Sequence, residues 1–440
     1  MMWHYLASMR SHKLANDDMD KLLAGKLRAH IEFCYSTIPY YHEVFNNLGL
    51  KPSDIQDTDD TRKLPPLTKQ DILANYQKIL NPNLKPTMIR STTGTTSKSL
   101  SIAYSARYLD ICNALRYRRN KILGTSIFDK TVWMPFLGPN TPSGTGSSES
   151  DGEFAPTLRR VWKLLFGSFF LKDFTLKFRT MGLNSQNIDK VSRELISFKP
   201  DILHSRPSYL RRMAIYLQQQ GTALRPKKLL VEGERLSNGM KSDLEDFYQA
   251  EVFDVIGARE FGGLGYECPA HSGLHLNSDY FLFEFLHNGE PASEGELAEM
   301  LITGLHNEAM PLIRYKIGDV VVPTKRERCE CGSNLVRLKS IDGRMSDGLV
   351  STNGERIAAG PVIEFLESVL NMRDYQLMQH APFIFELKVA AGRSIQEGMV
   401  EALILYLKEK IAMDPDLRIE RWDETQMPVK YRPVLSTVRS

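Results

Sequence analysis

Between residues 99 and 260, short apolar runs alternate with longer amphipathic stretches, and this alternation constrains the fold more than any other feature. The strand-like runs include TVWMPFL, DILHS, KKLLVEG and EVFDVIG, and the helical stretches between them include NIDKVSRELISF, SYLRRMAIYLQQQ and NGMKSDLEDFY. Repeated β-α units place successive strands side by side, with helices on the faces of a largely parallel sheet. The chain is therefore predicted to be an α/β protein.

Two later regions follow different patterns. The runs YFLFEFL and ELAEMLIT are typical of antiparallel strands. Beyond residue 345, amphipathic helices alternate with the strand candidates DYQLMQH, IFELKVA and RIERWD. We expect a large domain over residues 1–345, with mixed and parallel sheets and helices, and a small α+β domain over residues 346–440.

The composition is that of a globular protein. Of 440 residues, 42% are hydrophobic and 25% are charged, and 56 Lys and Arg against 53 Asp and Glu leave a net charge of +3. This balance does not favour nucleic acid or an anionic membrane as a partner. No apolar run reaches the roughly 18 to 20 residues of a transmembrane span, and the N-terminal stretch lacks the apolar core of a secretory signal. Five cysteines do not make a disulfide framework in a chain of this length, so we expect a cytoplasmic protein.

The tract TTGTTSKS, closed by Lys98 and Ser99, carries chemistry that suits an anionic ligand. Small residues let the backbone approach a ligand, while hydroxyls, N–H groups and an ammonium donate to anionic oxygens. The tract is not a Walker A loop, because Thr92 and Ser97 stand where that motif has glycines. By itself it fits a polyphosphate-binding loop and a flexible Ser/Thr turn equally well.

Five motifs in a fixed order extend this signal over nearly the whole chain. TTGTTSKS is followed by GAREFGG, RYKIGD, IDGRMSDG and, near the C-terminus, VKYRPV. This order resembles that of the adenylate-forming enzymes, and within them the phenylacetate–CoA ligases and the related capsule-biosynthesis proteins. The resemblance implies that the first motif binds the phosphates of ATP. The residues concerned are Thr92, Thr93, Gly94, Thr95, Thr96 and Lys98.

GAREFGG places Glu260 just after the strand-like run EVFDVIG. A carboxylate at the carboxyl end of a strand is well placed to meet Mg²⁺ that bridges phosphates, although an exposed loop glutamate is the commoner case. The resemblance implies that Glu260 is the catalytic, Mg²⁺-associated glutamate. It also implies nucleotide contacts from the residues before Glu260 and from the earlier strand end VEGERL. These residues are Gly257, Ala258, Arg259, Gly233 and Glu234.

RYKIGD and IDGRMSDG supply Asp319 and Arg344. A carboxylate can accept hydrogen bonds from both ribose hydroxyls of a nucleotide, and a guanidinium can contact ribose or phosphate. The resemblance implies these two roles. It also implies an interdomain hinge at Ser346 and Asp347, where Ser346 replaces the acidic residue that is usual in the family.

Lys430 lies in the last motif, MPVKYRPV. Joining a carboxylate to the α-phosphate of ATP builds negative charge on both groups, and a positioned ammonium stabilises that charge. The resemblance implies this catalytic role for Lys430. Val429 stands where the family usually has a glycine, which departs from the usual loop.

The cysteines indicate a second kind of site. Cys329 and Cys331 lie in CECG, and Cys268 is followed by His275. Three thiolates and one imidazole suit tetrahedral Zn²⁺, with His271 as the alternative to His275. Buried cysteines that act as small hydrophobic residues are the other reading, yet both segments are polar and rich in turn residues. The resemblance implies a structural zinc site.

Taken together, these residues predict an ATP-dependent enzyme that converts a carboxylic acid to acyl-AMP and releases pyrophosphate. The resemblance implies coenzyme A as the acceptor of the acyl group. In the capsule-related branch, an amine or a carrier-bound thiol would take its place. The remaining alternative is a non-catalytic nucleotide-binding protein of a polysaccharide pathway. A homodimer is a further expectation, and the identity of the acid is not readable from the sequence.

Overall fold

The computed structural model describes residues 1–91, 99–126, 128–134, 175–177, 188–344, 347–373, 375–390, 395–422 and 432–438. The chain forms two compact units, Met1–Ser126 with Val255–Ser340 and Ile127–Asp254 with Ile341–Ser440. Each unit therefore combines two separate stretches of sequence. The predicted division of the chain at residue 345 stays a prediction.

Helices form the N-terminal part of the first unit. Pro39 begins α3, where its fixed φ suits a first helical turn, and Gly49 ends that helix with a φ of +66°. Thr68 and Asp71 form a capping box at α4, in which the Thr68 hydroxyl accepts from the Asp71 N–H and the Asp71 carboxylate accepts from the Thr68 N–H. The helices are α1 (Met2–Ser11), α2 (Asn16–Thr37), α3 (Pro39–Leu48), η1 (Pro52–Asp54), η2 (Asp59–Lys63), α4 (Lys69–Ala74), α5 (Tyr76–Ile79) and α6 (Ala106–Ile122).

The strands of the first unit are mainly antiparallel. Strands β10 and β12 pair antiparallel, with Phe281 opposite Gly304, which confirms the prediction for YFLFEFL and ELAEMLIT. Strands β1 and β2 form a separate two-stranded sheet. The strands are β1 (Met88–Ser91), β2 (Ser101–Tyr104), β8 (Gly262–Glu267), β9 (Leu274–Leu276), β10 (Phe281–His287), β11 (Glu290–Pro291), β12 (Ala298–Gly304) and β13 (Tyr315–Pro323). Strands β7 (Glu251–Ala258) and β14 (Arg337–Arg344) each begin in one unit and end in the other.

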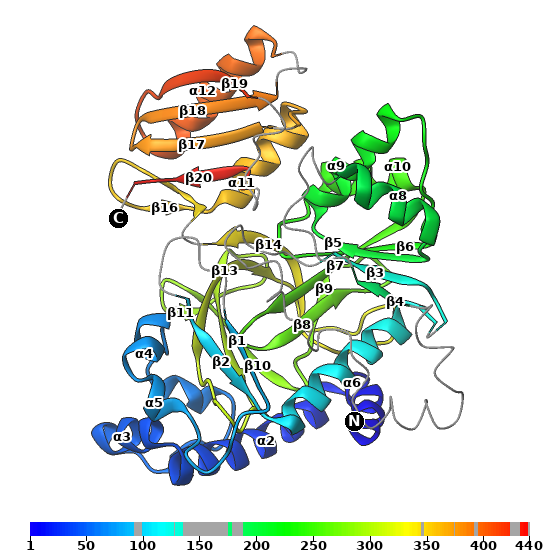
Figure 1. The fold of residues 1–440 in the computed structure, drawn as a ribbon. Coiled ribbons are helices and arrows are strands. Elements are labelled where there is room, and N and C mark those ends of the chain that lie inside the picture. Colours follow the sequence, from blue (N-terminus) through cyan, green and yellow to red (C-terminus); the bar gives the residue numbers. More distant parts are fainter. Residues whose placement is uncertain are drawn as a thin grey trace. The chain divides into compact units, whose positions relative to one another are not determined.

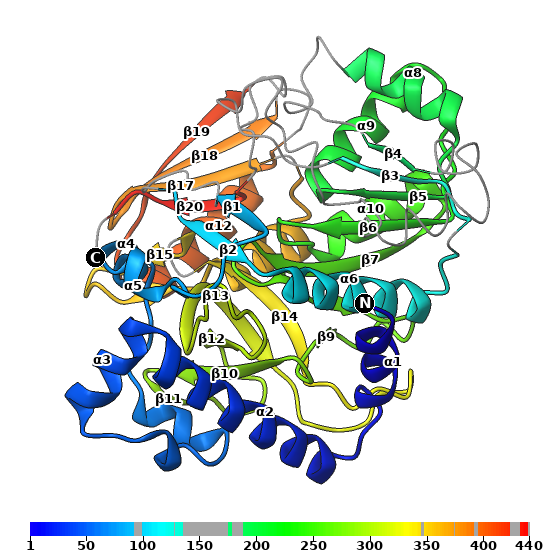
Figure 2. The same ribbon diagram turned by 60° about the horizontal axis from the view of Figure 1, so that its bottom comes forward.

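A fully buried ion pair joins α6 to the loop between β9 and β10. Nη2 of Arg118 lies 3.0 Å from Oδ1 of Asp279, and both side chains are inaccessible to solvent. Arg118 also donates to the Ser8 carbonyl oxygen and to Asn277 Oδ1, while Ser11 donates to Asp279. Burial alone would raise the pKa of Asp279, but the Arg118 charge and these hydrogen bonds outweigh burial and hold that pKa below its ordinary value. The pair therefore connects α1, which packs beside α6 (Figure 2), with the β9–β10 loop.

The second unit contains a parallel sheet and a small mixed sheet. Its helices are α8 (Ile188–Phe198), α9 (Pro207–Gln219), α10 (Asn238–Tyr248), α11 (Ala359–Glu364), the π-helical turn η4 (Phe365–Val369) and α12 (Glu397–Ile411). Its strands are β3 (Thr131–Trp133), β4 (Thr175–Lys177), β5 (Ile202–Ser205), β6 (Lys228–Glu232), β15 (Leu349–Val350), β16 (Arg356–Ile357), β17 (Tyr375–Ala381), β18 (Ile384–Ala390), β19 (Asp416–Trp422) and β20 (Val434–Ser436).

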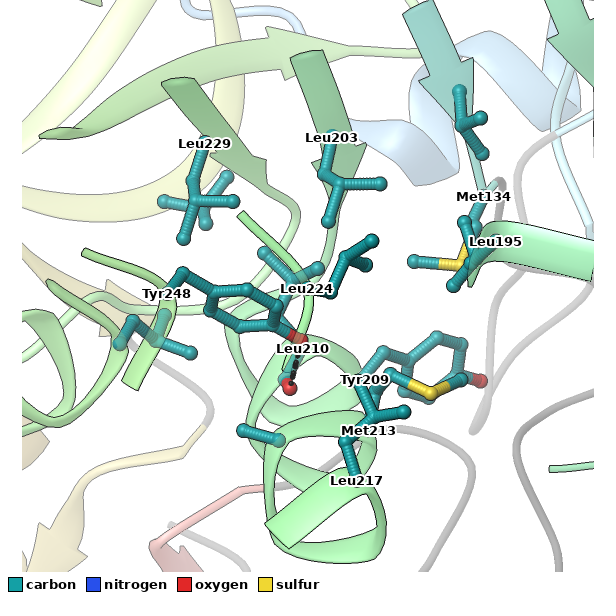
Figure 3. Close-up of a cluster of buried hydrophobic side chains, with 14 of the residues drawn as sticks. Met134, Leu195, Leu203, Tyr209, Leu210, Met213, Leu217, Leu224, Leu229 and Tyr248 are labelled. Carbon is teal, nitrogen blue, oxygen red and sulfur yellow. Dashed lines mark hydrogen bonds between the residues drawn. The ribbon is translucent and has the colours of Figure 1, made fainter. Parts of the chain in front are cut away.

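The parallel sheet has the strand order β6-β5-β3-β4. Helices α8, α9 and α10 cover one face of it, where Val132, Leu203 and Leu229 are buried among side chains of these helices. Figure 3 shows this cluster, in which the Tyr248 hydroxyl donates to the Leu210 carbonyl oxygen at 2.8 Å. The alternation of strands and helices seen in the sequence thus forms the predicted parallel sheet.

The C-terminal stretch forms a four-stranded sheet of order β19-β18-β17-β20 (Figure 1). Its buried core joins Leu377, Phe385 and Leu387 from the strands with Leu403 and Leu407 from α12. The predicted mixed α/β fold, with a small α+β element at the C-terminus, is confirmed. No helix in the described ranges is long and apolar enough to cross a membrane.

We expect Arg118→Met to destabilise the protein by about 3–5 kcal/mol, because the change leaves the Asp279 carboxylate buried without its counter-ion. Urea unfolding followed by circular dichroism measures this loss. Arg62→Met, which removes the exposed Arg62–Asp59 pair, is the matched control and should change stability by no more than about 1 kcal/mol. A wild-type unfolding midpoint for Arg118→Met would show that the pair does not hold α6 in place.

Candidate active site and metal site

The two strands that flank the predicted phosphate-binding motif lie side by side. Ser91, at the end of β1, is the register partner of Ser101, at the start of β2, and their hydroxyl oxygens are 3.2 Å apart. The ends of the intervening segment are therefore held close together. The predicted phosphate-binding residues themselves lie outside the described part of the chain: Thr92, Thr93, Gly94, Thr95, Thr96 and Lys98.

Glu260 lies in the tight turn between β7 and β8. The Phe261 N–H donates to the Ala258 carbonyl oxygen at 3.1 Å, and Gly262 has a φ of +74°, a conformation that favours glycine. A Cβ atom on Gly257 would lie 3.1 Å from the Gly262 carbonyl oxygen, so glycine at both positions lets the strands approach closely. The glycines of GAREFGG thus build the turn that carries Glu260.

Three tyrosine hydroxyls hold this turn. Tyr104 donates to the Arg259 carbonyl oxygen, Tyr108 donates to the Phe261 carbonyl oxygen at 2.8 Å, and Tyr315 donates to Glu260 Oε1 at 3.2 Å. The Tyr104 and Tyr108 rings stack with their centroids 5.3 Å apart. Burial raises the pKa of Tyr108 well above its ordinary value, so the hydroxyl stays a donor. The backbone on both sides of Glu260 and the carboxylate itself are each fixed by a hydrogen bond.

Tyr104 also links this turn to the predicted phosphate-binding motif. It ends β2, the strand that follows the motif, and the guanidinium of Arg90 from β1 lies 5.2 Å from the centre of its ring. Within the first unit, the structure therefore brings the flanks of the motif to the Glu260 turn.

Asp319 lies in β13, the strand that begins with Tyr315. The register of β13 with β12 shifts at this point, and Gly318 takes a φ of +83°. Such a bulge changes the direction of the side chains in a strand and is common next to functional sites. The glycine in RYKIGD explains why the strand can bulge directly before Asp319.

The other nucleotide-binding candidates lie in the second unit. Gly233 follows β6 with a φ of +82°. Glu234 is nearly buried, pairs with Arg206 at 3.1 Å and accepts from the Ser208 N–H at the start of α9. Glu234 thus supports the β6 strand end as well as being a candidate for nucleotide contact. Arg344 is exposed at the end of β14.

The predicted hinge and the last motif meet in the second unit. Nη1 of Arg432 donates to Oδ1 of Asp347 at 2.9 Å. Arg432 belongs to the motif that carries Lys430, and Asp347 is one of the two predicted hinge residues. Ser346 and Lys430 lie outside the residues that the structure describes.

Four side chains in the first unit could hold a metal ion. One ligand atom from each of Cys268, His275, Cys329 and Cys331 lies within 4.8 Å of the others. The Sγ atoms of Cys268 and Cys329 are 3.8 Å apart, and Cys331 Sγ is 3.4 Å from His275 Nε2. Zn–S and Zn–N bonds in a tetrahedron require separations of about 3.8 Å and about 3.6 Å, so the spacing fits this metal.

The backbone explains why these ligands meet. His275 lies in β9, opposite Tyr266 of β8 and Arg337 of β14. A Cβ atom on Gly265 would lie 2.5 Å from the His275 carbonyl oxygen, so glycine there permits the close approach of β9. His271, the alternative ligand, points elsewhere, since its Nδ1 lies 2.9 Å from Glu267 Oε1. Between the two histidines, the geometry selects His275.

The sequence did not single out the tyrosines at 104, 108 and 315. They are almost completely buried, with exposed fractions of 0%, 1% and 3%, and a buried tyrosine in a helix or strand has the same pattern as any core aromatic. Only the hydrogen bonds to the Glu260 turn distinguish them.

Comparisons with known proteins agree with the motifs. Phenylacetate–coenzyme A ligase of Escherichia coli (strain K12) is 25% identical over 347 residues, which cover 76% of this chain and 73% of that protein. Protein CapK of Staphylococcus aureus is 23% identical over 353 residues, which cover 79% of this chain and 72% of CapK. No family model matches the chain.

A solved structure supports the fold. 2-Hydroxyisobutyryl-CoA ligase, in complex with 2-HIB-AMP in the postadenylation state, aligns over 97% of this chain and 91% of that one, with a TM-score of 0.76 and 18% identity. The fold is thus that of adenylate-forming ligases. Together with the curated relatives, this likeness confirms the predicted resemblance to the adenylate-forming, phenylacetate–CoA ligase-like proteins.

We expect Tyr108→Phe to loosen the Glu260 turn, because the Phe261 carbonyl loses a donor worth about 1 kcal/mol. Amide hydrogen exchange in residues 257–263 should become about 3-fold to 10-fold faster. Tyr41→Phe is the matched control, since it removes another buried hydroxyl, bonded to the Pro311 carbonyl oxygen, from the same unit. Equal exchange in wild type and Tyr108→Phe would contradict the assigned role.

Proposed function

We propose that the protein is an ATP-dependent, AMP-forming acid–CoA ligase. It activates a carboxylic acid to acyl-AMP with release of pyrophosphate, and then transfers the acyl group to coenzyme A. The curated relatives named phenylacetate–coenzyme A ligase support this activity. The observation that carries it is the Glu260 turn, which Tyr104 ties to the flanks of the phosphate-binding motif.

Different residues would bind the phosphates, the base and the ribose of ATP. The TTGTTSKS motif and Gly257, Ala258 and Arg259 would hold the phosphates, and Gly233 and Glu234 would contact the base. Asp319 and Arg344 would bind the ribose. Mg²⁺, held by Glu260, would neutralise phosphate charge during the transfer.

Both half-reactions balance without another reactant. A carboxylate oxygen of the acid forms a bond to the α-phosphorus, and the bond from that phosphorus to the pyrophosphate oxygen breaks. Lys430 would stabilise the negative charge that develops in this step. The sulfur of coenzyme A then attacks the acyl carbon, the thiol loses its proton, and AMP leaves. The hinge at Ser346 and Asp347 would let the C-terminal stretch rearrange between the two steps.

The match to CapK supports a second candidate, in which an amine or a carrier-bound thiol takes the acyl group in the biosynthesis of a surface polysaccharide. A nucleotide-binding protein without catalysis is the remaining alternative. The retained charges at Glu260, Asp319, Arg344 and Lys430 favour an enzyme. The cytoplasmic location and the homodimer stay predictions.

Exchange of labelled pyrophosphate into ATP, measured over a panel of carboxylic acids, tests the first half-reaction. Lys430→Ala should lower exchange by about 10²-fold to 10³-fold while MgATP still binds, because the ammonium matters most when charge develops in the transition state. Lys408→Ala changes an exposed lysine of α12 and should leave exchange unchanged. Glu260→Gln should instead raise the Mg²⁺ concentration that exchange requires.

Two results would contradict this function. Wild-type exchange in Lys430→Ala would remove that residue from the chemistry. Tight binding of ATP without exchange for any acid in the panel would favour the non-catalytic alternative.

We also propose a structural zinc ion bound by Cys268, His275, Cys329 and Cys331. Four protein ligands leave no position for a substrate, so the ion would stabilise the fold. A thiolate is the form of cysteine that binds a metal. The ion would join the end of β8 to the turn at Cys329.

Elemental analysis of protein prepared without chelators should find about one Zn²⁺ per chain. Cys329→Ser should lower both the zinc content and the melting temperature, because the binding energy of a structural metal is folding energy. His271→Ala is the matched control and should keep the metal, whereas His275→Ala should lose it. The zinc proposal is wrong if wild-type protein contains no metal and Cys329→Ser has the same melting temperature as wild type. The cysteines would then be buried hydrophobic residues.

A further inference from the structure

Helix α1 has the reverse of the usual pattern of a surface helix. Such a helix normally turns its apolar side chains to the core and its polar side chains to solvent. In α1, Ser8 and Ser11 face the interior, with exposed fractions of 0% and 8%. Met2, Trp3 and Leu6 face solvent instead, with exposed fractions of 61%, 84% and 43%. The helix therefore presents apolar side chains that the described part of the chain leaves uncovered.

Hydrogen bonds to the helix backbone fix this orientation. Nη1 of Arg118 donates to the Ser8 carbonyl oxygen at 2.9 Å, and the Tyr280 hydroxyl donates to the His4 carbonyl oxygen at 3.1 Å. The first bond comes from α6, beside which α1 lies (Figure 2), and the second comes from the residue directly before β10. Because both bonds hold the inner side of α1, the fold itself turns the apolar side chains outward.

The exposed side of α1 is also basic. Arg10 follows Leu6 by four positions, so the two side chains lie on the same side of the helix, and Lys13 is exposed just after the helix ends. Residues 1–16 contain no aspartate or glutamate, and the first acidic residue, Asp17, belongs to α2. The net charge of the whole chain, +3, does not reveal this local excess of positive charge.

We propose that the α1 face, formed by Met2, Trp3, Leu6, Arg10 and Lys13, binds the surface of a membrane that contains anionic lipids. A helix with apolar and basic side chains can lie in the plane of a membrane surface, with its apolar side chains at the boundary of the acyl chains. Tryptophan is enriched at this depth, and anionic headgroups attract Arg and Lys. The proposal is independent of the proposed ligase activity.

A second copy of the chain would fit the α1 face less well. In a two-fold symmetric interface the face would meet itself, so Arg10 and Lys13 would approach their own copies without an opposite charge. A stable interface also buries about 800 Å² on each partner, and a helix of 10 residues with three exposed large apolar side chains supplies only part of that area. Anionic headgroups supply the missing opposite charge.

Cosedimentation with lipid vesicles tests the proposal. The full chain is mixed with vesicles of phosphatidylcholine alone, or of phosphatidylcholine with phosphatidylglycerol. Wild-type protein should bind the anionic vesicles at least about 10-fold more tightly than the neutral ones. Binding should weaken when the ionic strength rises from about 0.1 M to about 1 M, because salt screens the attraction between the basic side chains and the headgroups.

Paired substitutions test the apolar part of the α1 face. Trp3→Ser combined with Leu6→Ser should lower the affinity for anionic vesicles by about 10-fold to 100-fold, because two apolar side chains no longer leave water on binding. Leu405→Ser is the matched control, since it removes an exposed leucine of α12, and it should bind as wild type does. All of these side chains face solvent, so the melting temperatures should stay at the wild-type value.

Charge reversals test the basic part. Arg10→Glu combined with Lys13→Glu should lower the affinity for anionic vesicles by about 10-fold or more, because attraction to the headgroups becomes repulsion. Arg62→Glu combined with Lys63→Glu makes the same change in net charge at another exposed site of the first unit. This control should keep most of the wild-type affinity.

Tryptophan fluorescence tests whether Trp3 itself enters the membrane surface. Anionic vesicles should shift the emission of wild-type protein to shorter wavelength, because the indole moves into a less polar environment. Trp3→Phe should still bind but lose most of this shift. A shift that persists in Trp3→Phe would place a different tryptophan at the membrane and contradict the assignment.

Three other results would overturn the proposal. The first is equal binding, or no binding, of wild-type protein to the two kinds of vesicle. The second is wild-type affinity for anionic vesicles in the variant that combines Trp3→Ser and Leu6→Ser. The third is a dimer that forms without vesicles and is lost in this same variant, because a second copy of the chain would then cover the α1 face.

Discussion

The buried Arg118–Asp279 pair is the interaction on which the candidate active site depends. It fixes α6 against α1 and the β9–β10 loop, and Arg118 also donates to Asn277, whose amide donates to the Gly263 carbonyl oxygen of β8. Helix α6 carries Tyr108, which bonds the backbone next to Glu260. Because neither side chain reaches water, burying either charge without the other would strongly destabilise the folded state. The two charges must therefore stay in contact, and this requirement fixes the position of α6 and of the turn that it supports.

Strand β8 has a different group of side chains at each end. Its first residue, Gly262, belongs to the turn held by the tyrosines, and its last residue is followed by Cys268, one of the four candidate zinc ligands. The hydrogen bonds at the first end are directional. Metal–thiolate bonds at the second end would be stronger than these hydrogen bonds. A zinc ion in this place would therefore affect activity through the position of β8 without touching a substrate.

The two units contribute different parts of the proposed chemistry. The first unit holds Glu260, Asp319 and the flanks of the phosphate-binding motif, which are the groups expected around a metal-bound triphosphate. The second unit holds Gly233, Glu234 and Arg344, the candidates for contact with the base and the ribose. Ordered motifs carry the candidate nucleotide-binding groups of both units, whereas the side chains that bind an acid are scattered along a chain. This difference explains why the family is readable from ordered motifs and the substrate is not.

The sequence by itself determined the α/β alternation, the antiparallel strands of YFLFEFL and ELAEMLIT, the small C-terminal α+β element and the family. These features depend on local periodicity and on glycines that build turns, such as those around Glu260, and both are visible in a short window of residues. It also named the four metal-ligand candidates. Only the tertiary structure decided between His275 and His271, because that choice depends on how β9 lies against β8. It alone revealed the tyrosines that bond the Glu260 turn, since a buried tyrosine looks the same in sequence whether or not its hydroxyl bonds a distant turn. Those roles depend on contacts between residues far apart in the chain, such as the 153 positions that separate Tyr108 from Phe261.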